Sequence, residues 1–173
     1  MNAVGKDANG RSADVNGNLL FIYGTLLPGQ CRWSLLAPFQ TRVVGPATTR
    51  GWLLDLHEYP GLVCADWFAR TGHAQPCRSG EPTVFGQAVH VGDWDAAVRV
   101  LDEEEGCLRV ELGFQDAEEI RRATTERDLG LYVRRWQPII LADGSKTWAW
   151  AYLYNQTVNS PKWIETGNWL SRG

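Results

Sequence analysis

The stretch from Tyr132 to Tyr154 constrains the fold of this chain more than any other. The turn dipeptide Asp143-Gly144 separates two apolar runs, Tyr132 to Leu141 and Thr147 to Tyr154, which is typical of a β-hairpin. In the second run, aromatic side chains alternate with small or aliphatic ones at the two-residue period of a strand. The aromatic positions are Trp148, Trp150, Tyr152 and Tyr154, and the others are Ala149, Ala151 and Leu153. Because both faces are apolar, we expect this strand to be covered on both sides.

Other short apolar segments, each bounded by turn residues, predict further strands. They span Leu19 to Tyr23, Ala47 to Leu56 and Val84 to Val91. The clearest helix is Asp93 to Glu105, because Asp93 can act as an N-cap and Gly106 as a helix stop. A weaker helical pattern covers Asp116 to Arg127. Most of the fold is therefore expected to be sheet.

Length and composition indicate one globular domain. A chain of 173 residues with 44% hydrophobic and 21% charged residues can bury a proper core. Its 17 basic and 20 acidic residues give a net charge of -3, and no basic cluster is longer than a pair such as Arg134-Arg135. This argues against nucleic acid or an anionic membrane surface as the partner. No apolar run approaches the roughly 20 residues that span a bilayer.

The first 18 residues differ from the rest of the chain. They are polar and Gly-rich and lack the continuous apolar stretch of a secretory signal. We therefore expect a flexible tail over residues 1–18, a domain over residues 19–173, and a cytoplasmic location.

The cysteines and histidines do not form a recognisable metal motif. The four cysteines form no close pair in the sequence, and without a secretory signal an even count does not imply disulfides. The spacing of His57, Cys64, His73 and Cys77 matches no common zinc pattern. We therefore expect no metal.

One acid in the predicted helix differs from its neighbours. At about 100° per residue, Trp94, Val98 and Leu101 share a face, and Glu105 is the next residue on it. Of the four consecutive acids from Asp102 to Glu105, only Glu105 points along the centre of this apolar stripe. Burial and the helix C-terminus would both raise the pKa of such a carboxyl, which makes it a candidate general base. Alternatively, the helix ends a turn early and leaves Glu105 on a solvated rim. The periodicity leaves both possibilities open.

The segment LFIYGTLLPGQC is a second candidate for part of a functional site. Leu19 to Tyr23 is followed by Gly24, where a strand can bend or let another group approach its backbone, and then by the turn Pro28-Gly29. A strand that ends in a tight turn exposes successive backbone N–H groups, which can hold a carboxylate or a developing oxyanion. The alternative is a strand and a turn without chemistry.

Several motifs in chain order resemble one family. They are FIYGTLLPGQ (Phe21 to Gln30), YPGLV (Tyr59 to Val63), VFGQAVHV (Val84 to Val91), LDEEEG (Leu101 to Gly106), YVRRWQPIIL followed by DGSKTWAWAYLYN, and IETGNW (Ile164 to Trp169). Together they cover roughly Leu19 to Trp169 and are similar to the γ-glutamylcyclotransferase-like family, including its γ-glutamylamine and plant AIG2-like branches.

The resemblance implies an α+β fold, a small mixed β-barrel with flanking helices and a pocket at one end. It implies that Glu105 is the catalytic base and that the loop Tyr23-Gly24-Thr25-Leu26 supplies backbone N–H groups to the substrate. It also makes Tyr154 a candidate pocket wall. The implied reaction converts a small γ-glutamyl amine, peptide or amino acid to 5-oxoproline and releases the amine, with no metal or cofactor.

This chain departs from the family pattern at three places. Leu27 stands where many members carry a basic residue, Cys107 stands where Tyr is frequent, and the stretch 108–131 is longer than the family minimum. These differences bear on which substrate fits. Two alternatives stay open: a cyclotransferase that acts on a carrier-bound or biosynthetic intermediate, and a non-catalytic binding module of the same fold. The sequence leaves the leaving amine and the oligomeric state open.

Overall fold

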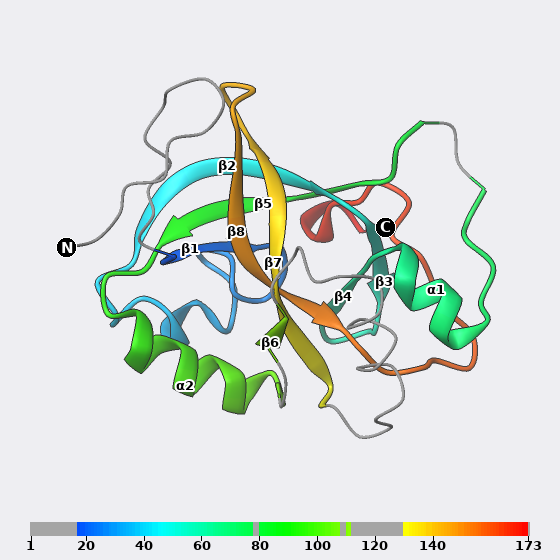
Figure 1. The fold of residues 1–173 in the computed structure, drawn as a ribbon, viewed down its shortest axis with the longest axis horizontal. Helices are drawn as coiled ribbons and strands as arrows, with labels where there is room; N and C mark the ends of the chain where they lie inside the picture. Colours follow the sequence, from blue (N-terminus) through cyan, green and yellow to red (C-terminus); the bar gives the residue numbers. More distant parts are fainter. Residues whose placement is uncertain (1–16, 78–79, 108–109, 112–129, 173) are drawn as a thin grey trace.

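Five strands close into a barrel in the computed structural model, which describes residues 17–77, 80–107, 110–111 and 130–172 (Figure 1). Around the barrel the strands run in the order β2 (Arg42–Arg50), β5 (Thr83–His90), β1 (Leu19–Ile22), β8 (Lys146–Tyr154) and β7 (Tyr132–Leu141), and β7 pairs back onto β2. β1 and β8 are parallel, whereas the other neighbouring barrel strands are antiparallel. A short strand, β6 (Val110–Glu111), adds in parallel to β7. The expected fold, an α+β mixed barrel with flanking helices, is confirmed.

The hairpin expected between Tyr132 and Tyr154 is present. These two residues face each other at one end of the β7–β8 pair, and Ile140 faces Lys146 at the other. The Gly144 N–H donates to the Leu141 carbonyl at 2.9 Å, with Gly144 at φ +80°, a conformation that glycine adopts without strain.

Side chains alternate between two apolar clusters on either side of the barrel wall. The cluster that fills the interior takes Phe21 from β1 and Ala149, Ala151 and Leu153 from β8. The cluster outside the wall takes Leu20 and Ile22 from β1, Tyr152 and Tyr154 from β8, and Ala97 and Leu101 from a helix. The prediction that both faces of the last strand are covered is confirmed.

The outer cluster is closed by helix α2 (Trp94–Glu104), which packs through its buried residues Ala97 and Leu101 near the short 3-10 helix η1 (Trp33–Leu35). The helix ends one residue before the predicted boundary, and Glu105 is its C-cap. Gly106 follows at φ +56°, so the predicted stop is confirmed. The side chain of Asp93 makes no capping hydrogen bond with its neighbours among the described residues.

The strand predicted over Ala47 to Leu56 is wrong as a single element. It divides into β2 and β3 (Trp52–Asp55), and β3 forms a separate hairpin with β4 (Pro60–Val63). Gly51 lies at the break, where an added Cβ would lie 2.7 Å from Leu62 and 2.9 Å from the Val63 carbonyl oxygen. The chain can therefore turn from the barrel into the hairpin only because this position has no side chain.

A second helix, α1 (Ala65–Thr71), follows β4 and was not predicted from the sequence. It lies beside the β3–β4 hairpin (Figure 1), where the ring of Phe68 meets that of Trp52 edge-on at 4.8 Å. The segment 1–16 of the predicted tail and the predicted helix 116–127 lie outside the described residues. Within the described part of the chain, no helix is long and apolar enough to cross a membrane. A last 3-10 helix, η2, spans Trp169–Ser171.

Candidate active site

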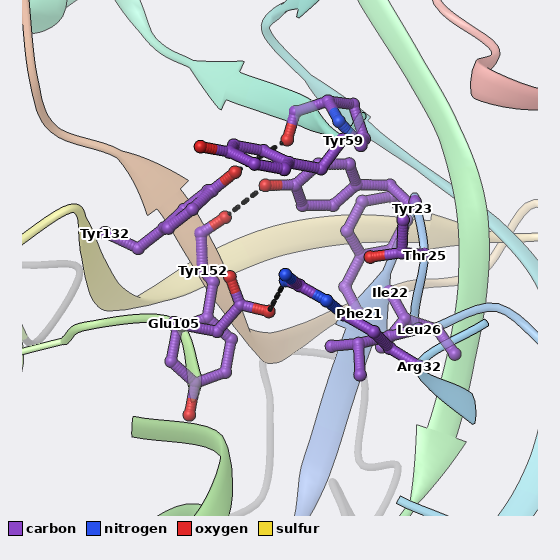
Figure 2. Close-up of a pocket in the computed structure, with 12 residues that line it drawn as sticks. Phe21, Ile22, Tyr23, Thr25, Leu26, Arg32, Tyr59, Glu105, Tyr132 and Tyr152 are labelled. Carbon is purple, nitrogen blue, oxygen red and sulfur yellow. Dashed lines mark hydrogen bonds and ion pairs between the residues drawn. The ribbon is translucent and has the colours of Figure 1, made fainter. Parts of the chain in front are cut away.

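A pocket opens where β1 leaves the barrel and turns into the loop that follows it (Figure 2). It encloses about 360 Å³ of space, including solvent at its mouth. Its lining comes from segments far apart in the chain: Phe21, Ile22, Tyr23, Gly24, Thr25, Leu26, Arg32, Tyr59, Pro60, Glu105, Tyr132 and Tyr152. Four of the five proposed substrate-binding residues, Tyr23 to Leu26, therefore lie with Glu105 around one cavity.

Glu105 enters this pocket from the end of α2. It is 6% exposed, whereas Glu103 and Glu104 are exposed. Its N–H donates to the Leu101 carbonyl at 2.8 Å, which continues the helical backbone into the cap and directs the side chain along the buried face. The prediction that Glu105 alone lies on the buried side is confirmed, and the solvated-rim alternative is wrong. Its role as the catalytic base stays a prediction.

Burial raises the pKa of the Glu105 carboxyl from 4.5 to about 7. The positive charge of Arg32 opposes this shift, and the negative charge of Glu104 adds to it. A carboxyl with such a pKa can take up and release a proton near neutral pH, as a general acid and base must.

Arg32 faces Glu105 across the cavity (Figure 2). One terminal guanidinium nitrogen lies 4.0 Å from a Glu105 carboxylate oxygen, and Nε lies 3.1 Å from Glu104 at the rim. The guanidinium carbon lies 5.7 Å from the centre of the Tyr59 ring. The side chain is 30% exposed, so the pocket has a charged group that water and ligands can reach.

The loop Tyr23-Gly24-Thr25-Leu26 is buried along its whole length and is tied down through its carbonyl groups. The Gly24 carbonyl accepts from the Leu27 N–H, and the Thr25 carbonyl accepts from the Arg32 N–H, both at 3.0 Å. Among the described residues, the N–H groups of Thr25 and Leu26 donate to no other backbone group. These two donors are available to a ligand.

Gly24 is where another group approaches the loop backbone, as predicted. A Cβ at this position would lie 2.4 Å from Cγ and 2.8 Å from Cδ of Pro60. The absence of a side chain at Gly24 therefore lets β4 pack directly against the loop.

Two tyrosine hydroxyls fasten the walls of the pocket. The Tyr23 hydroxyl donates to the Tyr152 carbonyl at 2.6 Å and accepts from the Leu62 N–H at 3.2 Å. The Tyr132 hydroxyl donates to the Pro60 carbonyl at 2.8 Å. Burial raises the pKa of both phenols, so they stay neutral. They hold β1, β4, β7 and β8 together around the cavity.

Tyr154, the fifth proposed substrate-binding residue, is not among the described residues that line the pocket. Its ring packs edge-on against Tyr132 at 5.5 Å and beneath Gly61, where an added Cβ would lie 2.9 Å from the Tyr154 Cβ. Tyr152 and Tyr132 form the wall instead. Tyr152 and Tyr154 share a face of β8 but lie about 7 Å apart along the strand, so periodicity alone does not tell which one reaches the cavity.

The last turn of α2 is anchored to the barrel by a partly buried network that the sequence did not predict. Arg134 donates to both carboxylate oxygens of Asp102, at 3.0 and 3.2 Å, and its guanidinium lies over the rings of Trp94 and Trp150. The Tyr152 hydroxyl donates to the same carboxylate at 2.6 Å. Because Asp102 lies one turn before Glu105, this network fixes the helix end that carries the candidate base.

The departures at Leu27 and Cys107 lie outside the set of described lining residues. Both side chains are buried in the outer apolar cluster, and the Cys107 sulfur accepts from the Arg134 N–H at 3.3 Å. These two residues can therefore affect the pocket only indirectly, through the packing of the elements that carry its lining residues.

The structure gives no metal centre to His57, Cys64, His73 and Cys77: over the described ranges, no group of three or more His, Cys, Asp or Glu side chains could hold a metal ion. The His73 ring stacks on Trp67 at 5.1 Å.

Treatment with a chelator such as EDTA is therefore expected to change neither the melting temperature nor ligand binding. Thermal denaturation before and after dialysis against the chelator measures this. Stoichiometric zinc in the purified protein, lost together with stability on chelation, would contradict the expectation.

Comparison with known proteins identifies the family. The family model described as gamma-glutamyl cyclotransferase, AIG2-like, matches residues 20–171. Among solved structures, the chain is similar to YkqA from Bacillus subtilis, with a TM-score of 0.53 and 20% identity over 88% of this chain and 39% of YkqA. It is also similar to an AIG2-like protein (GGACT) from Mus musculus, with a TM-score of 0.51 and 17% identity over 82% of this chain and 80% of that one. No curated protein sequence matches the chain.

At these identities the two structures establish a shared fold, and this chain spans less than half the length of YkqA. The family model, in contrast, covers nearly all of the described chain, from β1 to η2. The chain therefore belongs to the gamma-glutamyl cyclotransferase, AIG2-like family.

Proposed function

We propose that this protein converts a γ-glutamyl amine, peptide or amino acid to 5-oxoproline and releases the amine. The observation that carries the proposal is the position of Glu105: a buried carboxyl with a raised pKa that shares a small pocket with the open N–H groups of Thr25 and Leu26. Membership in the family supports a cyclotransferase-type reaction.

The reaction needs no nucleophile from the protein. Glu105 takes a proton from the α-ammonium group of the substrate, and the freed nitrogen attacks the γ-carbonyl carbon to close a five-membered ring. The bond between that carbon and the leaving nitrogen then breaks as Glu105 gives its proton to the leaving nitrogen. The ionised Glu105 next takes the second proton from the ring nitrogen and passes it to the released amine or to water. One carboxyl can thus serve in each of these proton transfers, and the γ-glutamyl amide becomes 5-oxoproline and an amine.

The charge that develops on the γ-carbonyl oxygen needs hydrogen-bond donors already in place. The amides of Thr25 and Leu26 suit this role because their loop is buried and held through its carbonyls, so little reorganisation is needed. The rings of Tyr59 and Tyr132 narrow the pocket, which favours a curled substrate whose amine lies near its own γ-carbon.

A panel of γ-glutamyl compounds tests the proposal directly. The purified protein is incubated with γ-glutamyl amines, γ-glutamyl amino acids and a γ-glutamyl group on a carrier, and 5-oxoproline is measured by chromatography. Release from free compounds supports the proposal, whereas release from the carrier alone favours the biosynthetic alternative. Binding of 5-oxoproline without turnover of any member would indicate a non-catalytic module.

A further inference from the structure

We infer that Arg32 binds the α-carboxylate of the γ-glutamyl group, so that Arg32 and Glu105 together recognise the amino-acid end of the substrate as a zwitterion. The inference rests on the proposed function and makes Arg32 a specificity-determining residue of the same pocket.

The spacing of the two side chains carries the argument. The ammonium nitrogen and the carboxylate carbon of an α-amino acid are bonded to one carbon and lie about 2.5 Å apart, from standard bond lengths. A base that contacts the nitrogen therefore has the carboxylate within reach of any cation beside it. The Arg32 guanidinium is such a cation, 4.0 Å from the Glu105 carboxylate (Figure 2).

The charged residues of the pocket lining match the two charged groups of an α-amino acid. Among the described residues around the cavity, Arg32 supplies the permanent positive charge and Glu105 the carboxyl group. The ion pair with Glu104 engages Nε, and a guanidinium has five N–H donors in all. Because its fork fits a carboxylate through two parallel hydrogen bonds, Arg32 can bind the substrate while its Nε keeps the contact at the rim.

Binding of the α-carboxylate by Arg32 also indicates which substrate group the loop Tyr23-Gly24-Thr25-Leu26 binds. The sequence left open whether the N–H groups after β1 hold a carboxylate or a developing oxyanion. With the carboxylate on Arg32, the N–H groups of Thr25 and Leu26 are left for the γ-carbonyl oxygen, where charge develops during ring closure.

Substrate choice follows from the pair. A ligand needs a free α-carboxylate to bind Arg32, so an α-carboxamide or an analogue without this group should bind poorly. The pair does not restrict the group carried by the leaving nitrogen, since Arg32 binds the opposite end of the substrate and Glu105 needs to reach only the nitrogen atom itself.

Binding of two rings that differ only in the carboxylate tests the inference without requiring turnover. L-5-Oxoproline and 2-pyrrolidinone are titrated by calorimetry into the wild type, Arg32→Met, Arg32→Lys and Glu104→Gln. The wild type should bind 5-oxoproline more tightly, and Arg32→Met should weaken that binding about 10- to 100-fold, the range for a charged hydrogen-bonded contact. Binding of 2-pyrrolidinone should change little, and Arg32→Lys should fall between.

Glu104→Gln is the matched control, because it removes the other partner of Arg32 and keeps the guanidinium. It should preserve the preference for 5-oxoproline. The inference fails if the wild type does not bind 5-oxoproline, if Arg32→Met weakens both rings equally, or if Glu104→Gln has the same effect as Arg32→Met. Arg32-dependent binding without turnover in the panel above would overturn the proposed function alone, and turnover that is indifferent to Arg32 would overturn this inference alone.

Discussion

Replacing Glu105 by Gln is expected to lower kcat for 5-oxoproline release by about 100-fold or more, the scale for loss of a general base. The amide keeps the size and shape of the carboxyl but cannot accept the proton of the substrate ammonium group. Steady-state kinetics on the best substrate of the panel measures the loss, and calorimetric titration checks that 5-oxoproline still binds.

The raised pKa of Glu105 gives this prediction a pH signature. Because only the ionised carboxyl accepts a proton, kcat/KM of the wild type should rise as pH increases through about 7. The folded state holds this proton more tightly than the unfolded state, so the associated stability is complete below pH 4.5 and is lost as pH rises through about 7. Glu105→Gln should therefore be more stable than the wild type at alkaline pH, by up to about 3 kcal/mol in the free energy of unfolding. The difference should vanish below pH 4.5, and urea denaturation at both pH values measures it.

Glu103→Gln and Glu104→Gln serve as controls, since both side chains are exposed. Each should leave kcat within a few-fold of the wild type. If Glu104→Gln were inactive while Glu105→Gln stayed active, the assignment of the base to Glu105 would be wrong.

Gly24→Ala is expected to lower both stability and turnover. The new methyl group would lie 2.4 Å from Cγ of the Pro60 ring, so the buried loop or β4 has to shift. Overpacking of this kind costs about 1–3 kcal/mol in the free energy of unfolding. The resulting shift of the loop amides should reduce kcat/KM by roughly 10²-fold, the effect of a displacement near 1 Å. Urea denaturation and steady-state kinetics measure the two losses.

Pro60→Ala tests whether the close approach between residue 24 and the Pro60 ring causes these losses. It removes the two ring atoms that the methyl would meet and keeps Cβ, which lies 3.9 Å away in ordinary contact. The double variant Gly24→Ala with Pro60→Ala should thus be more stable than the sum of the two single effects predicts. Simple additivity would show that the close approach is not the source of the loss.

Local patterns predicted the closing hairpin and identified Glu105 as the acid on the apolar helix face, but they left open whether the helix extends far enough to bury it. The face of Glu105 follows from the helical spacing of Leu101 and its neighbours, and the β7–β8 hairpin from two apolar runs around one turn dipeptide. The break at Gly51 could not be found in this way, because the reason for it is the close packing of Leu62 and Val63, which come from another strand. Helix α1 is too short for its spacing to stand out.

The rest of the pocket depends on contacts between distant segments. Arg32 lies in an irregular stretch before η1, where no period indicates which way its side chain points. Tyr59, Tyr132 and Tyr152 come from three separate segments, namely the turn before β4 and the strands β7 and β8, which the fold brings together around Glu105. The aromatic stripe of β8 contained the signal for Tyr152, but choosing it over Tyr154 requires the position of β4.

The parallel pairing of β1 with β8 has a consequence for how the chain acquires its pocket. The Tyr23 hydroxyl and the Tyr152 carbonyl that it binds are 129 positions apart. Pairings of such separation are slow to form, because a long loop must be closed before any contact compensates for the lost entropy. On the ribosome, β1 and its loop emerge early and wait, with exposed apolar edges, until β8 is synthesised. The ligand site can therefore form only after β8 has been synthesised, and until then the strand available to pair with β1 is β5, its antiparallel neighbour.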